Sequence, residues 1–114
     1  LKIKLILNEK PKTPGWSNIN YQIFSTASGI KFAKKMGLKY IVKTRTDCRI
    51  YSSNFLLYCK TLINKFPSSI PNRKRIISTD FSTKHIAYGL SDIFQFGAIE
   101  EMELFWKYIP LKFL

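Results

Sequence analysis

The 114-residue chain lacks several features that would assign a protein to a class at once. No stretch approaches the roughly 18 to 20 apolar residues that a membrane-spanning helix needs, because Lys, Arg, Asn or Pro interrupts every hydrophobic run. Two cysteines, Cys48 and Cys59, are too few for a disulfide framework and lie in no metal-binding spacing, which favours a reducing compartment. A Gly-rich phosphate loop is also missing. We therefore expect a cytoplasmic protein.

Acidic residues are scarce as well. The chain has seven Asp and Glu against 19 Lys and Arg, which gives a formal net charge of +12. Residues 1–79 carry 16 basic and two acidic side chains, whereas residues 80–114 carry three and five. Any single lysine can be explained as a solvated side chain on a helix face. The uneven distribution of charge along the chain also fits a phosphate-bearing partner or peripheral contact with an anionic membrane surface.

What the chain does contain is enough apolar material for one core. Hydrophobic residues make up 46% of it, and its length is typical of one domain. The first residue is Leu1 rather than Met, and the strand-like pattern begins at once. We therefore expect residues 1–114 to form a single domain that is an internal fragment of a larger one.

Hydrophobic periodicity predicts an α/β fold with a partly parallel sheet and flanking helices. Strand, helix and strand in succession over 2–44 predict a parallel crossover unit. Gly37 lies where a left-handed residue would end the first helix. The expected strands cover 2–7, 38–44, 75–79 and 93–96, and the expected helices cover 18–36, 55–66 and 99–108.

The segment 43–49 is the most informative stretch, because polar residues follow directly on a buried strand. In open α/β sheets, ligands bind outside the carboxyl ends of strands. Asp47 could hold a divalent metal or a ribose hydroxyl there, and Arg45 offers a planar fork for a diphosphate. The alternative is an Asp that caps the turn and pairs with the neighbouring Arg.

Two further features support a binding site at this end of the strand. Asn18, Asn20 and Gln22 open the first helix with more amide groups than capping needs, and a helix N-terminus suits anionic groups. Asp92 precedes the last expected strand and could face Asp47 across a crevice, although an ordinary Asx-turn would also explain it.

These segments together resemble the WavE lipopolysaccharide synthesis proteins, a bacterial family of glycosyltransferases with the A-type nucleotide-sugar transferase fold. The Lys-x-Arg-x-Asp element at a strand end, followed at this distance by Ser-Asp and Phe-Gly, is the most specific part of the match. The matching pieces occur in family order and cover residues 18–23, 25–26, 33–40, 43–47, 90–92 and 96–97.

The resemblance implies transfer of a sugar from a nucleotide-sugar donor to a lipopolysaccharide or other surface-glycan acceptor, which can be lipid-linked, at the inner face of the cytoplasmic membrane. It also implies an incomplete Rossmann-like fold. Asp47 would take the place of the final acid of an Asp-x-Asp motif that holds Mg²⁺ or Mn²⁺, but Arg45 stands where the first acid would be, so metal dependence stays open. Asp92 would contact the acceptor, or act as base if the transfer inverts configuration.

The donor diphosphate would then contact a small set of polar side chains from the first helix and the strand end. The set consists of Asn20, Gln22, Lys43, Arg45 and Asp47.

Two alternatives remain. One is a basic nucleic-acid-binding or nuclease module that uses Asp47, Asp80 and Lys84, and the other is a catalytically inactive scaffold of the same fold. The aromatic residues lie at core spacing, with no exposed stripe for base stacking, so we expect no nucleic-acid partner.

Overall fold

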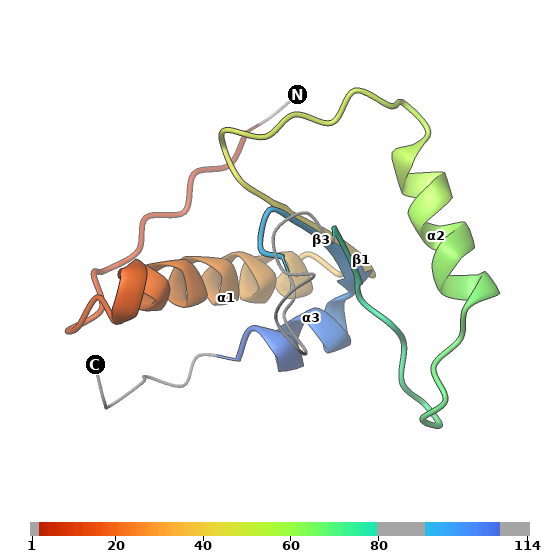
Figure 1. Ribbon diagram of the computed structural model, residues 1–114. Coiled ribbons are helices and arrows are strands. Elements are labelled where there is room, and N and C mark those ends of the chain that lie inside the picture. The colour runs from red at the N-terminus through yellow and green to blue at the C-terminus, as the bar shows by residue number, and fades with distance from the viewer. Residues whose placement is uncertain (1–2, 80–90, 108–114) are drawn as a thin grey trace.

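The computed structural model describes residues 3–79 and 91–107. Over these residues the chain forms three α-helices, three short strands and one 3₁₀ turn (Figure 1). In chain order the elements are η1 (Trp16–Asn18), α1 (Ile19–Lys35), β1 (Tyr40–Thr44), α2 (Phe55–Lys65), β2 (Ile77–Ser78), β3 (Phe94–Ala98) and α3 (Ile99–Phe105).

The end of α1 is marked by the predicted glycine. Gly37 has φ +72°, and its N–H donates to the carbonyl of Lys34 at 3.0 Å. The N–H of Leu38 reaches back to the carbonyl of Ala33 at 3.2 Å. These two hydrogen bonds form a Schellman motif, which satisfies carbonyls at the helix end and turns the chain into β1.

The sheet has the order β1-β3-β2, and both hydrogen-bonded pairs of strands are antiparallel. Val42 of β1 and Ile77 of β2 both lie opposite Phe96 of β3. The α/β class is therefore confirmed, but the expected partly parallel, Rossmann-like sheet is wrong for the described residues.

The amino-terminal segment explains why the expected parallel pairing is absent from the described residues. The described residues 3–7 form no strand, and the side chains of Ile3, Leu5 and Leu7 are largely exposed. Their alternation with Lys favours an extended backbone, but an extended segment becomes a strand only when it finds a partner. β1 instead pairs with β3, which follows it by some 50 residues in the chain.

Hydrophobic side chains cover both faces of the sheet. On one face, Ile41 packs with Ile30 of α1 and Met102 of α3. On the other face, Phe96 packs with Cys59 and Ile63 of α2. Figure 1 shows the resulting arrangement, with α1 and α3 close together and α2 apart from them.

We predict that Met102→Ala lowers the free energy of unfolding by about 2–5 kcal/mol, because it leaves a cavity at a side chain that has no solvent exposure. Urea unfolding of both proteins measures the difference. Leu104→Ala is the matched control on the same helix, since Leu104 is 52% exposed, and it should cost less than about 1 kcal/mol. Equal losses for the two variants would show that α3 does not pack as described.

Candidate functional site

Lys43, near the carboxyl end of β1, turns its side chain into the molecule. This side chain is only 10% exposed, and its ammonium group lies 3.8 Å from Oδ2 of Asp92. The same group donates to the backbone carbonyl of Asp92 and lies 5.2 Å from the centre of the Trp106 ring. A carboxylate, a carbonyl and an aromatic face therefore surround one largely buried cation.

Gln22, in the first turns of α1, reaches the same carboxylate. Its Nε2 donates to Oδ2 of Asp92. Gln22, Lys43 and Asp92 thus converge from α1, β1 and the segment before β3. All three were predicted as site residues, and the structure brings them together.

The environment of Lys43 changes its acidity. Burial lowers the pKa of Lys43, and the charge of Arg45 acts in the same direction, while the Asp92 carboxylate opposes both. Partial burial thus makes the ammonium form of Lys43 less favourable than in water, and Asp92 compensates for part of this cost.

Arg45 and Asp47 form a second pair just beyond the strand. Nε of Arg45 donates to Oδ1 of Asp47, and Nη2 donates to Oδ2, both at 2.9 Å. The hydrogen bonds from Arg45 lower the pKa of Asp47. Both side chains are at least half exposed, so the pair contributes little to folding stability.

The two groups of residues belong to one end of the sheet. Lys43 and Arg45 are two positions apart at the end of β1. The hydrogen bond from Arg45 to Asp47 is the main cause that raises the pKa of Arg45, and the Asp92 carboxylate makes a smaller contribution in the same direction. The structure shows no direct contact between Asp47 and Asp92: Asp92 contacts Gln22 and Lys43, and Asp47 contacts Arg45.

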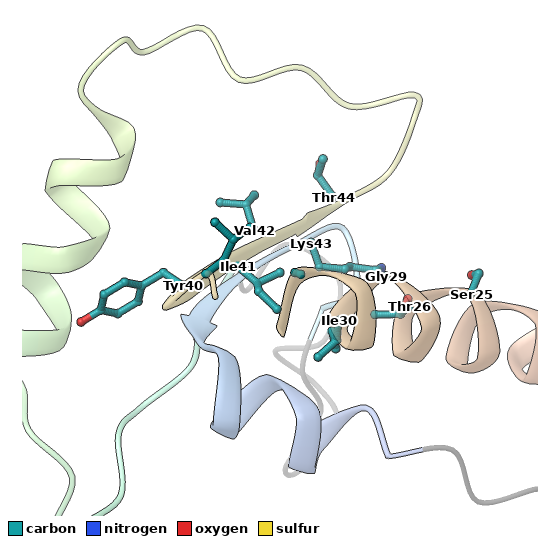
Figure 2. Close-up of a pocket in the computed structure, with 11 residues that line it drawn as sticks. Ser25, Thr26, Gly29, Ile30, Tyr40, Ile41, Val42, Lys43 and Thr44 are labelled. Carbon is teal, nitrogen blue, oxygen red and sulfur yellow. The ribbon is translucent and has the colours of Figure 1, made fainter. Parts of the chain in front are cut away.

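A hollow of about 520 Å³ lies between α1 and β1. Figure 2 shows Ser25, Thr26 and Gly29 on its helix side and the residues of β1 on its strand side. Lys43 and Thr44 line the hollow at the carboxyl end of β1, so it opens beside the cluster around Asp92.

Buried polar residues hold the Asp92 segment in place. Nε1 of Trp106 donates to Oε1 of Gln95 at 2.6 Å, and Nε2 of Gln95 donates to the carbonyl of Ser91 at 3.2 Å. The hydroxyl of Ser78 donates to the same carbonyl at 2.9 Å. Gln95, Ser91 and Trp106 are almost fully buried, so these bonds satisfy groups that would be costly to leave unpaired.

The model of the family described as WavE lipopolysaccharide synthesis matches residues 9–111. The chain belongs to the WavE family. The match covers nearly the whole WavE chain, including Gln22, Lys43, Arg45, Asp47 and Asp92, and it relates the protein to lipopolysaccharide synthesis. No curated protein and no solved structure matches the chain significantly.

Asn20 makes its hydrogen bonds to Thr13 rather than to the residues around Asp92. Its side chain has no solvent exposure, and Nδ2 donates to the carbonyl of Thr13 at 3.1 Å. This bond ties the loop before α1 to the helix. The role of Asn20 in donor binding stays a prediction, and the observed contact is with the loop.

The described residues do not assemble a metal site of their own. Among residues 3–79 and 91–107, no group of three His, Cys, Asp or Glu side chains could hold an ion. Asp47 is the carboxylate predicted to bind Mg²⁺ or Mn²⁺, but both of its oxygens accept hydrogen bonds from Arg45. A divalent ion here would need other oxygens, such as those of a bound diphosphate.

Sequence reasoning missed Gln95, Ser91 and Trp106 as residues that support the site. One signal was available, because Gln95 is a polar residue at the centre of an apolar strand. Two residues invoked for the nuclease alternative, Asp80 and Lys84, lie outside the described residues. Among the helices in the described parts of the chain, none is both long and apolar enough to span a membrane.

We predict that Arg45→Met raises the pKa of Asp47 toward the ordinary Asp value of about 3.9. In the wild type, the lowered pKa keeps the Asp47 carboxylate charged, and the ion pair intact, until the pH falls through that lower value. An acid titration followed through the NMR chemical shift of the Asp47 carboxyl carbon measures this pKa in both proteins. Lys43→Met is the control and should leave this pKa unchanged. An unchanged pKa in Arg45→Met would show that the pair does not form in solution.

Proposed function

We propose that this WavE protein is a glycosyltransferase that transfers a sugar from a nucleotide-sugar donor to a lipopolysaccharide or other surface-glycan acceptor. The observation that carries the proposal is the convergence of Gln22, Lys43 and Asp92 beside the Arg45–Asp47 pair at one end of β1. The site combines cations for a diphosphate with a carboxylate that can serve as a base.

The cations suit the leaving group of such a reaction. When the bond between the anomeric carbon and the donor breaks, negative charge develops on the diphosphate oxygen. Nε and Nη2 of Arg45 donate to Asp47, which orients the guanidinium and leaves the N–H groups of its Nη1 side for phosphate oxygens. Lys43 adds a second cation whose partial burial strengthens its electrostatic effect.

Asp92 suits the acceptor side. Its side chain is 40% exposed, so an acceptor hydroxyl can reach it. In an inverting transfer, the hydroxyl proton would pass to Asp92 while the hydroxyl oxygen bonds to the anomeric carbon and the diphosphate leaves with the electron pair of the broken bond. Gln22 and Lys43 would keep the carboxylate pointed toward the acceptor.

The hollow between α1 and β1 would receive part of the donor. Its end near Lys43 includes Ser25 and Thr26, whose hydroxyl groups can bind sugar or ribose hydroxyls. Its other end is mostly apolar and suits the flat face of a base or sugar. A donor lying along the hollow would place its diphosphate near Lys43 and Arg45.

We predict that Asp47→Asn and Asp92→Asn each reduce sugar transfer per folded molecule at least about a hundredfold, or roughly 2.7 kcal/mol in barrier. Asp47→Asn should leave the melting temperature nearly unchanged because its ion pair is exposed, whereas Asp92→Asn should lower it because the largely buried Lys43 loses its counter-charge. The assay measures nucleoside diphosphate released from a panel of UDP-, GDP- and ADP-linked hexoses, with lipopolysaccharide as acceptor. Glu100→Gln, an exposed carboxylate at the other end of the sheet, should retain full activity.

Two outcomes would contradict the proposal in different ways. A wild-type protein that neither binds nor turns over any donor in the panel would support the inactive scaffold. An active wild type with near-normal turnover in Asp47→Asn would remove Asp47 from the site while leaving the activity in place.

We predict that Gly29→Met weakens binding of the donor at least about tenfold without destabilising the protein. A Cβ atom added at Gly29 would meet nothing within 4 Å, and Gly29 lines the hollow, so a methionine there can project into it. Methionine is also a better helix former than glycine. Gly29→Ala is the control: it should stabilise the helix by up to about 1 kcal/mol and leave binding intact. Calorimetric titration measures the donor affinity, and thermal unfolding measures the stability. Unchanged affinity in Gly29→Met would show that the donor binds elsewhere.

A further inference from the structure

A second charged surface lies on α2 and the loop that follows it. Residues 55–75 carry five basic side chains and no acidic one. We call this surface the basic face, and its cations are Lys60, Lys65, Arg73, Lys74 and Arg75. Figure 1 shows α2 and this loop at the margin of the molecule, far from the first turns of α1.

Most of the positive charge on the basic face is unpaired. Arg73 forms an ion pair with Glu101 at 2.6 Å. In the described parts of the chain, the other four cations have no carboxylate within ion-pair distance. The ammonium groups of Lys60 and Lys74 both approach the ring of Tyr40, at 5.4 and 5.7 Å from its centre. An anionic partner would offset the repulsion between these cations.

Apolar side chains are exposed among these cations. Leu57 is 67% exposed and Tyr58 is 65% exposed, on the helix whose inner side packs through Cys59 and Ile63. Ile70, in the loop, is 63% exposed. The partner must therefore accept both positive charge and apolar side chains.

We propose that the basic face binds the anionic surface of a lipid bilayer. Anionic headgroups would neutralise the lysines and arginines, and the apolar side chains would enter the boundary between headgroups and acyl chains. Nucleic acid would match the charge but would leave Leu57 and Ile70 without a suitable contact. A second copy of this chain is a poor match, because the chain is itself strongly basic, with 19 Lys and Arg against seven Asp and Glu.

This surface does not compete with the candidate site. Tyr40, which the basic face contacts, begins β1, whereas Lys43 and Thr44 end it near Asp92. A protein bound to a bilayer through the basic face would thus keep the other end of the sheet free. Membrane binding through the basic face does not depend on the proposed transfer reaction. In a transferase, it would bring the protein close to a lipid-linked acceptor.

The test is cosedimentation of the full chain with vesicles at physiological salt. We expect binding to vesicles of phosphatidylglycerol and phosphatidylcholine in equal parts, and little binding to phosphatidylcholine alone. Lys60→Gln/Lys65→Gln should weaken binding roughly 10- to 30-fold. Lys31→Gln/Lys35→Gln removes the same charge from exposed positions of α1 and should change binding less than about threefold.

A second pair of variants tests the apolar contribution. Leu57→Gln should weaken vesicle binding several-fold, whereas Leu104→Gln, at an exposed position of α3, should not. Melting temperatures confirm that all four variants are folded. Full binding by Leu57→Gln would show that apolar insertion plays no part and would overturn the proposal.

Three further outcomes would also contradict binding of the basic face to a bilayer. Equal losses for the two lysine double variants would mean that net charge alone attracts the protein to vesicles. A larger effect of Lys60→Gln/Lys65→Gln on duplex DNA than on vesicles would assign the face to nucleic acid. A dimer in solution that Leu57→Gln dissociates would assign the face to a second copy.

Discussion

The antiparallel pairing of β1 with β3 is the constraint on which the rest of the structure depends. It places Lys43 opposite Gln95 and brings the segment that carries Asp92 to the carboxyl end of β1. Because side chains alternate between the faces of a strand, a slip of one residue would turn Lys43 toward α2 and move Ile41 out of the core beneath α1. One register therefore decides both the packing of the sheet and the composition of the site.

The partly buried charge of Lys43 is tolerated because its surroundings are polar and fixed. The Asp92 carboxylate and carbonyl lie beside the ammonium group, and the face of Trp106 lies against it. Trp106 is itself held by its hydrogen bond to Gln95. A charge removed from water needs such preorganised partners, so the buried bonds of β3 and α3 support the residues proposed to act on the substrate.

The two ends of the small sheet differ in chemistry. The end near Thr44 combines carboxylates with cations and opens into a hollow, as a site for a charged substrate requires. The end near Tyr40 has several unpaired cations and exposed apolar side chains, as a surface for attachment requires. The proposed substrate site and the proposed membrane-binding surface are separate because α2 packs on the opposite face of the sheet from α1 and α3.

The sequence by itself determined the helices, most of the strands and the polar cluster around 43–47, because these depend on local patterns: helical spacing, the left-handed Gly37 and polar residues after a buried strand. It also placed Gln22, Lys43 and Asp92 among the candidate site residues, which the structure brings together. Only the tertiary structure decided which strands pair, that residues 3–7 stay outside the sheet, and that Gln95 and Trp106 support the Asp92 segment. Strand partners and side-chain contacts between different elements depend on the packing of the whole chain, which hydrophobic periodicity does not encode.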